Sequence, residues 1–232
     1  MQQLLLQIKW QMLLLHRNQL INISVAVTVL YGLGFFIFKD MEKAREFLTL
    51  LIFNDPAIIG LFFVSLPIMI EKQEGVLAAL FVSPVKLHHF LLARVICLSL
   101  LGWACSLGMV MTLLGLDFHF LHFSVGTFSS CAVFGLIGIV MVSYTDVFLI
   151  FILRTIPVLL LLSLPLLNIF ELTDVQTFKW LPTQAGLDLI ANSYADKPNS
   201  HAISWAYASI AIWLPVLYFL AYRIFKNKVV NA

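Results

Sequence analysis

Long apolar runs, separated by short polar segments, dominate the pattern of this chain. Six of them predict helices, at residues 20–38, 56–74, 95–116, 123–143, 147–169 and 204–222. The runs approach the ~20 apolar residues that a helix needs to cross the hydrocarbon core of a bilayer. None alternates apolar and polar positions as the strands of a transmembrane barrel do. The pattern therefore predicts an all-α membrane protein with six transmembrane helices in one domain, residues 1–232.

The start of the second helix is predicted from Asn54-Asp55-Pro56. Asn and Asp are preferred at helix N-caps, and proline is favoured in the first turn because its missing N–H needs no partner there. These residues place the beginning of the helix at Pro56, and the helix continues through Glu71. Residues 39–55 are then the connection between the first two spans.

Two segments are amphipathic rather than apolar throughout. Residues 1–19 mix leucines with Gln, Lys, His and Arg, and Trp10 suits the depth of the lipid headgroups, so an interfacial helix is predicted. This segment lacks the pattern of a cleavable signal peptide, and none is expected. Residues 170–203, which Pro182, Gly186 and Pro198 interrupt, predict short helices that rest on or re-enter the outer leaflet.

Composition supports a membrane protein and narrows its chemistry. Charged residues make up 11% of the chain, against about 25% in soluble proteins, and hydrophobic residues make up 61%. A net charge of +2 without basic runs excludes a nucleic-acid-binding protein. Cys97, Cys105 and Cys131 all lie in apolar runs, which argues against a disulfide framework and against thiol catalysis.

The distribution of Lys and Arg predicts the orientation in the membrane. With both termini in the cytoplasm, nine of the 14 basic residues lie on the inner side and five on the outer side. Cytoplasmic loops carry the excess of Lys and Arg in membrane proteins. We therefore expect a multi-pass protein of the cell inner membrane with cytoplasmic N and C termini, and with residues 71–89 in the cytoplasm.

The fourth predicted span is rich in small residues. Cys131 and Gly135 are four residues apart, a small-xxx-small pair that lets the backbone of another helix approach closely. This spacing predicts a packing contact between helices and carries no chemistry of its own.

The most specific motif is the segment 71–84, EKQEGVLAALFVSP. Glu71 and Glu74 share one face of the continuing second helix, and Gly75 then permits the backbone to turn. Ser83-Pro84 ends the segment, because the residue before proline disfavours helix. The apolar positions that recur at helical spacing are Val76, Leu77, Leu80 and Phe81. This order of charged residues, turn, apolar face and proline predicts a short coupling helix, within region 75–89, that transmits force between a cytoplasmic partner and the spans. An ordinary amphipathic loop would not require these features in this order.

Catalytic and nucleotide-binding motifs are absent from the sequence. There is no Gly-rich phosphate-binding loop, so any ATPase must be another polypeptide. No catalytic serine with histidine, aspartate pair or H-E-x-x-H motif occurs, so no catalytic residue is assigned. His119 and His122, with Asp117 nearby, would need further ligands to hold a metal ion. No metal site and no cofactor are therefore assigned to this chain.

Arg154, Pro157 and Asn168 in the fifth predicted span are the candidates for a substrate path. Arg154 lies roughly 10 Å into the span at 1.5 Å per residue. An arginine inside a span usually faces the protein interior or water, but at this depth its long side chain can also reach the headgroups. Both interpretations stay open. Prolines and Asn168 favour a kink that frees backbone carbonyls toward a cavity.

Segment 71–84 resembles the E-(K/R)-x-x-G-T-L-x-x-L-x-x-(S/T)-P element of ABC-2 type transporter membrane subunits. Glu71, Glu74 and Gly75 match the elbow at the end of the second span, and Val76 stands where the family often has Thr. Residues Leu77, Leu80, Ser83 and Pro84 match the coupling helix that contacts the ATPase subunit. Leu181-Pro182 resembles the outer segment before the last span. The form EGVLAALxVSP is most similar to small drug-export permeases of the fluoroquinolone type.

The resemblance implies a half-size permease of a bacterial ATP-driven ABC exporter for an amphipathic small molecule or a lipid-like substrate. It implies alternating access, with a path along the first, second and fifth spans. The implied partners are a separate ABC ATPase, which binds ATP and Mg²⁺, and a second or related permease. A haem-exporter-type permease of cytochrome c maturation and a non-transporting membrane scaffold are the alternatives.

Overall fold

The computed structural model describes residues 2–17, 19–38, 44–77, 86–170, 172, 176–195 and 199–230. Its α-helices are α1 (Gln2–Arg17), α2 (Leu20–Phe38), α3 (Ala44–Ile58), α4 (Val64–Gln73), α6 (Leu87–Leu114), α7 (Phe120–Ser143), α8 (Phe148–Ser163), α9 (Leu166–Ile169), α10 (Pro182–Ser193) and α11 (Ser200–Phe225). The π-helices η1 (Ile59–Phe63) and η3 (Lys226–Val230) and the 3-10 helix η2 (Gln176–Trp180) complete them. Within these ranges there is no strand, which confirms the all-α prediction.

Within the described ranges, five helical segments are long and apolar enough to cross a membrane. They are Glu46–Gln73, Leu87–Thr112, Phe120–Ser143, Phe148–Ile169 and Ser200–Val230. Helices α1 and α2 meet at a bend of 65° and give a sixth span only if the pair is taken as one. The separate span at residues 20–38, the interfacial helix and the re-entrant helices therefore stay predictions.

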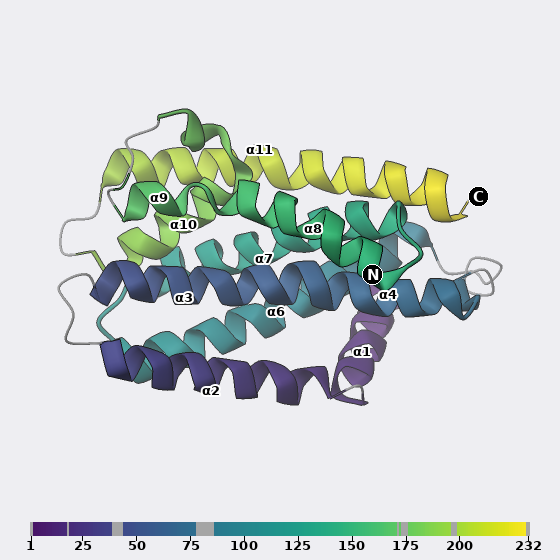
Figure 1. Ribbon diagram of the computed structural model, residues 1–232, viewed down its shortest axis with the longest axis horizontal. Helices are drawn as coiled ribbons and strands as arrows, with labels where there is room; N and C mark the ends of the chain where they lie inside the picture. The colour runs from purple at the N-terminus through teal and green to yellow at the C-terminus, as the bar shows by residue number, and fades with distance from the viewer. Residues whose placement is uncertain are drawn as a thin grey trace.

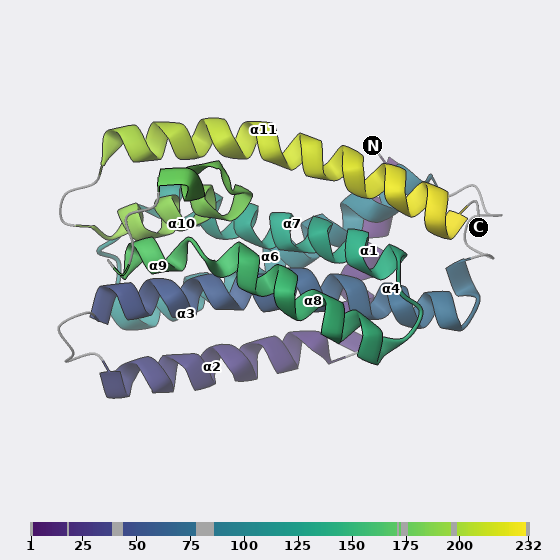
Figure 2. The same ribbon diagram turned by 45° about the horizontal axis from the view of Figure 1, so that its top comes forward.

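The long helices lie side by side along one axis (Figures 1 and 2). Both views place α2 and α11 at opposite edges of the bundle, with α7 between them. Helix α1 instead crosses the bundle direction (Figure 1). The C-terminus lies at the same end as the end of α4 and the start of α6, which we call the α4 end. The start of α3 and helix α10 lie at the opposite end, which we call the α10 end.

The predicted start of the second helix is wrong. The helix begins at Ala44, runs through Asn54, Asp55 and Pro56, and continues through η1 and α4 to Gln73. The apolar residues before Pro56 favour continuing the helix into the membrane, and a spanning helix tolerates a proline where neighbouring groups satisfy the freed carbonyl. The π-helix η1 follows three residues after Pro56, and such segments absorb local irregularity in a helix. Asp55 therefore lies within a helical segment, Glu46–Gln73, that is long and apolar enough to cross a membrane.

Helix α7 is the centre of the bundle. In its most apolar stretch 72% of the residues are buried, against 17% for the α11 segment. The small residues of α7 explain this burial: a Cβ added at Gly60 of η1 would overlap the carbonyl oxygen of Cys131 and lie 3.0 Å from the nitrogen of Gly135. The close packing predicted for Cys131 and Gly135 is thus confirmed, with η1 as the partner.

Helix α10 packs against the other end of α7. A Cβ at Gly186 would lie 3.2 Å from the carbonyl oxygen of Gly126, so the two backbones approach closely there. The Thr183 hydroxyl also donates a hydrogen bond to the Leu162 carbonyl at 2.8 Å. These contacts fix the segment before the last helix against α7 and α8.

Candidate functional site

The candidate site is the segment Glu71–Leu77 at the α4 end, which we call the joint. Helix α4 ends at Gln73, and the Glu74 N–H donates to the carbonyl of Ile70 at 2.9 Å. Gly75 follows with φ of +71°, a left-handed conformation that glycine adopts without a steric cost. The glycine turn predicted from the sequence is therefore present. The predicted residues Leu80, Phe81, Ser83 and Pro84 lie outside the described residues.

A buried ion pair ties the joint to α6. One Glu71 carboxylate oxygen accepts a hydrogen bond from Arg94 Nη2 at 2.5 Å, and the Arg94 side chain is only 2% exposed. The guanidinium also lies over the Phe90 ring, 4.7 Å from its centroid. Among the described residues, the second Glu71 oxygen and Arg94 Nε and Nη1 find no hydrogen-bond partner. The pair is thus the main neutralising contact of a buried guanidinium and a half-buried carboxylate.

A second set of contacts ties the joint to the connection between α7 and α8. Lys72 Nζ lies 2.6 Å from a carboxylate oxygen of Asp146, and Gln73 Nε2 donates to the Asp146 backbone carbonyl at 2.6 Å. The Asp146 side chain is 74% exposed, so water screens this ion pair. Glu71, Lys72 and Gln73 at the end of α4 therefore contact two neighbouring elements, which are α6 and the connection between α7 and α8.

Beyond these contacts the joint is partly free. Glu74 and Val76 are exposed, whereas Leu77 is 3% exposed and belongs to the hydrophobic core. A helix end that is anchored on one side and exposed on the other can take up a force from outside and pass it to α6 and to the α7–α8 connection.

The predicted path residues do not lie together. Arg154 is exposed on α8, and its Nη1 donates to the Tyr144 carbonyl at the end of α7 at 3.3 Å. Pro157 is exposed one turn further along α8. Asn168, on α9, lines a cavity at the α10 end. Their role in a substrate path stays a prediction.

The cavity at the α10 end has a volume of about 650 Å³ and a lining that mixes polar and apolar side chains. Besides Asn168 it is lined by Ile169, Lys179, Trp180, Gln184, Asp188, Asn199, His201, Ala202 and Trp205. Burial raises the pKa of Asp188 to about 6, although a hydrogen bond from Gln184 Nε2 at 2.6 Å acts in the opposite direction. Trp180 and Trp205, which both line this cavity, pack edge to face with ring centroids 5.6 Å apart.

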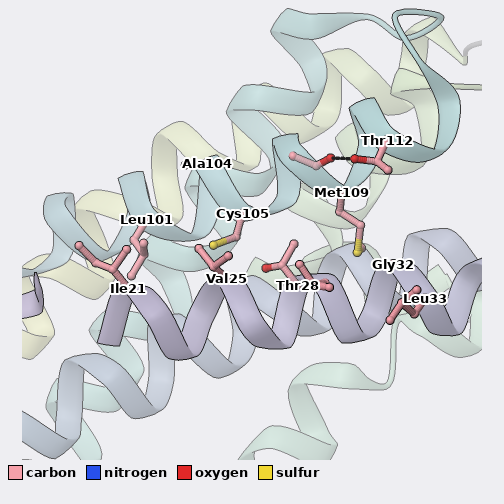
Figure 3. A pocket seen from close by; sticks show the side chains of 12 residues that line it. Ile21, Val25, Thr28, Gly32, Leu33, Leu101, Ala104, Cys105, Met109 and Thr112 are labelled. Carbon is pink, nitrogen blue, oxygen red and sulfur yellow. Dashed lines mark hydrogen bonds between the residues drawn. The ribbon is translucent and has the colours of Figure 1, made fainter. Parts of the chain in front are cut away.

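A second cavity, of about 620 Å³, lies between α2 and α6 and is almost entirely apolar (Figure 3). Its lining is Ile21, Val25, Thr28, Val29, Gly32, Leu33, Leu101, Ala104, Cys105, Gly108, Met109 and Thr112. Behind this wall, the Thr28 hydroxyl donates to a carboxylate oxygen of Asp55 at 3.4 Å.

Sequence reasoning did not single out Arg94, which pairs with Glu71, or Asp55, which lies next to Thr28. Arg94 interrupts an apolar run just as Arg154 does, and that signal was available. Asp55 was assigned to a helix cap because Asn54-Asp55-Pro56 fits an N-cap pattern, although the residue lies inside a longer helix. In the part of the chain that the structure describes, no group of three His, Cys, Asp or Glu residues is placed to hold a metal ion. His122 instead hydrogen-bonds the Tyr207 hydroxyl at 2.8 Å.

Comparisons with known proteins agree with a transport subunit. The profile of the fluoroquinolones export permease protein family matches residues 2–232. Two curated proteins, from two strains of Mycobacterium tuberculosis and both named fluoroquinolones export permease protein, are each 27% identical over 145 residues. The match covers 61% of this chain and 60% of the length of each relative.

Proposed function

The chain belongs to the fluoroquinolones export permease protein family, and we propose on that basis that it is the membrane subunit of an ATP-driven exporter. A separate ABC ATPase binds ATP and Mg²⁺ and contacts the joint from the cytoplasm. A second copy of the chain, or a related permease, completes the transport route. The substrate is an amphipathic small molecule or a lipid-like molecule that crosses the inner membrane of a bacterium.

The observation that supports this proposal most directly is the construction of the joint. The Gly75 turn follows the end of a membrane-spanning helix, and the preceding turn is paired with Arg94 and Asp146. A loop that only connected two spans would need neither a buried ion pair nor contacts to two further elements. A segment that transmits force needs both, because a loose attachment would absorb the movement.

In the proposed mechanism, closure of the ATPases moves the segment after Gly75. Because Glu71 is paired with the buried Arg94, α4 and α6 move as one body at this end. The Lys72 and Gln73 contacts carry the movement to the start of α8. The helices then alternate between arrangements open to either side of the membrane.

Two alternatives make different predictions. A haem-exporter-type permease of cytochrome c maturation would stimulate its ATPase in response to haem. A non-transporting scaffold would bind partners without any effect on ATP hydrolysis. The cheapest discriminating observation is whether a neighbouring gene encodes a soluble protein with a Walker A loop.

The test is reconstitution of the purified chain with its co-encoded ATPase in liposomes, with ATP hydrolysis and substrate uptake measured together. We expect a stable complex and stimulated hydrolysis. Glu74→Lys and Gly75→Leu should uncouple hydrolysis from transport, since the first reverses an exposed charge and the second strains a left-handed turn, which costs roughly 1–2 kcal/mol.

Matched controls lie at the opposite end of the molecule. Asp117 is an exposed carboxylate and Gly115 has φ of +67°, close to that of Gly75, and neither a Cβ at Gly115 nor one at Gly75 meets another atom within 4 Å. Asp117→Lys and Gly115→Leu should leave coupling unchanged. Equal effects at both ends would exclude the joint as the coupling element, and the absence of any complex with the ATPase would exclude the proposed function.

A further inference from the structure

Asp55 is a carboxylate within a segment that is long and apolar enough to span the bilayer. It lies nine residues after Glu46, where the spanning segment starts, so its depth is about 14 Å at 1.5 Å per residue. The whole segment is about 42 Å long at 1.5 Å per residue, so a hydrocarbon core of about 30 Å centred on it includes Asp55, in the half nearer Glu46. The side chain is 1% exposed. Ionisable groups in such places are rare and usually face a pathway for ions, protons or substrates.

The hydrogen bond between Thr28 and Asp55 is long. The Thr28 hydroxyl lies 3.4 Å from a carboxylate oxygen of Asp55, but the same hydroxyl also donates to the Ser24 carbonyl at the shorter distance of 2.9 Å. A hydroxyl has one hydrogen to donate, so the Ser24 contact takes most of it. Among the described residues, no Lys, Arg or His forms an ion pair with Asp55. Within the described part of the chain, the carboxylate therefore has no cationic partner.

Thr28 joins Asp55 to the cavity between α2 and α6. In Figure 3, Cys105 and Met109 point from α6 toward α2, and Thr28 lies between them on the α2 side. The volume of about 620 Å³ falls in the range of about 300–1,000 Å³ that is usual for small-molecule sites. Apart from Thr28, Cys105 and Thr112, the lining side chains are apolar or absent.

We propose that this cavity binds amphipathic organic cations, with Asp55 as the counter-charge. The apolar part of the ligand packs between α2 and α6, and its cationic group lies beside Thr28. The hydroxyl keeps its bond to Ser24 when the ligand displaces the weak contact to Asp55, so the carboxylate becomes available at little cost. The inference rests on the proposed function, which it deepens by naming the charge of the substrate.

The experiment measures binding to the full-length chain in lipid nanodiscs without the ATPase. The probes are tetraphenylphosphonium and tetraphenylborate, which have nearly the same shape and opposite charge. We expect the cation to bind more tightly than the anion. Asp55→Asn keeps the shape and removes the charge, and should weaken cation binding by about tenfold or more, as loss of one partner of a buried charge pair does. Asp188→Asn removes a carboxylate from the other cavity and should change nothing.

A second variant tests the cavity without altering Asp55. Gly108 lines it, and a Cβ there meets nothing within 4 Å, so Gly108→Leu fills the space while helix α6 is kept. Cation binding should be lost. Cys105 gives an independent measurement, because it lines the cavity while Cys97 and Cys131 do not. In a Cys97→Ala, Cys131→Ala background, the cation should slow maleimide labelling of Cys105, and Asp55→Asn should abolish that protection.

The proposal is overturned if cation and anion bind alike, if Asp55→Asn binds the cation as well as the parent chain, or if Gly108→Leu has no effect. If Asp55 exchanged only protons, the cation would not protect Cys105 from labelling. That result would also overturn the proposal. Stimulation of the ATPase is scored separately. Stimulated hydrolysis without cation binding would refute this inference alone, and cation binding without any ATPase complex would refute the proposed function alone.

Discussion

Removal of Arg94 tests whether the joint is held by its buried ion pair. Arg94→Met replaces the guanidinium with an apolar side chain and leaves Glu71 without its cation. Breaking a buried pair in this way costs ~3–5 kcal/mol, because one charge remains in a poorly solvated place. The Glu71 side chain is 22% exposed, so water offsets part of the loss. We therefore expect a destabilisation near the lower limit, about 3 kcal/mol.

The assay is thermal unfolding of the purified chain in detergent. For a chain of this size, a loss of about 3 kcal/mol lowers the unfolding midpoint by roughly 6–12 °C on the scale of globular proteins. The double variant Glu71→Gln, Arg94→Met should recover most of the loss, because no unpaired charge remains. Lys72→Met is the neighbouring control: it breaks only the screened contact to Asp146, which is worth at most about 1 kcal/mol. A loss below about 1 kcal/mol for Arg94→Met, or no recovery in the double variant, would refute the reasoning.

Two further predictions concern packing and pH. Gly60→Ala should cost about 1–3 kcal/mol in thermal unfolding, since its Cβ overlaps the backbone of α7, whereas Gly34→Ala in an open helical position should be neutral or slightly stabilising. Asp188 has a pKa raised to about 6, so the folded chain holds its proton more firmly than the unfolded chain does. Its contribution to stability is therefore present near pH 4 and is lost as the pH rises through about 6; Asp188→Asn should flatten this part of the pH profile, and an unchanged profile would contradict the assignment.

Apolar runs and small residues were sufficient to predict much of the fold. A helix of 20 or so apolar residues has few alternatives in a bilayer, and the helices that end at Gln73, Leu114, Ser143 and Ile169 stop within two residues of the predicted ends 74, 116, 143 and 169. The first two of them begin earlier than predicted, at Ala44 and Leu87. The close packing at Cys131 and Gly135 could also be predicted, because only small residues let the backbones of two helices approach closely. Its partner in η1 was not, since a sequence does not reveal which helix faces which.

The site was only partly predictable, for a physical reason. Gly75 was identified because a left-handed turn needs a particular residue, and this constraint is local. The pairing of Glu71 with Arg94 joins residues 23 positions apart, and it depends on how α4 and α6 lie against each other. Local patterns carry no information about such a contact, although an arginine within an apolar run marks a place where a partner is needed.

The continuous helix from Ala44 to Gln73 changes the environment that is assigned to the Asp55 carboxylate. If the helix began at Pro56, Asp55 would lie in an outer connection, where water solvates a carboxylate and no partner is required. In the continuous helix the same residue faces α2 within the bilayer, while Gly60 contacts α7 and Glu71 contacts α6. One helix thus touches the apolar cavity, the centre of the bundle and the joint. Any force that moves Glu71 acts on the element that carries Asp55, so the proposed cation site and the proposed coupling site share a single rigid connection, interrupted only by the π-helix at Ile59–Phe63.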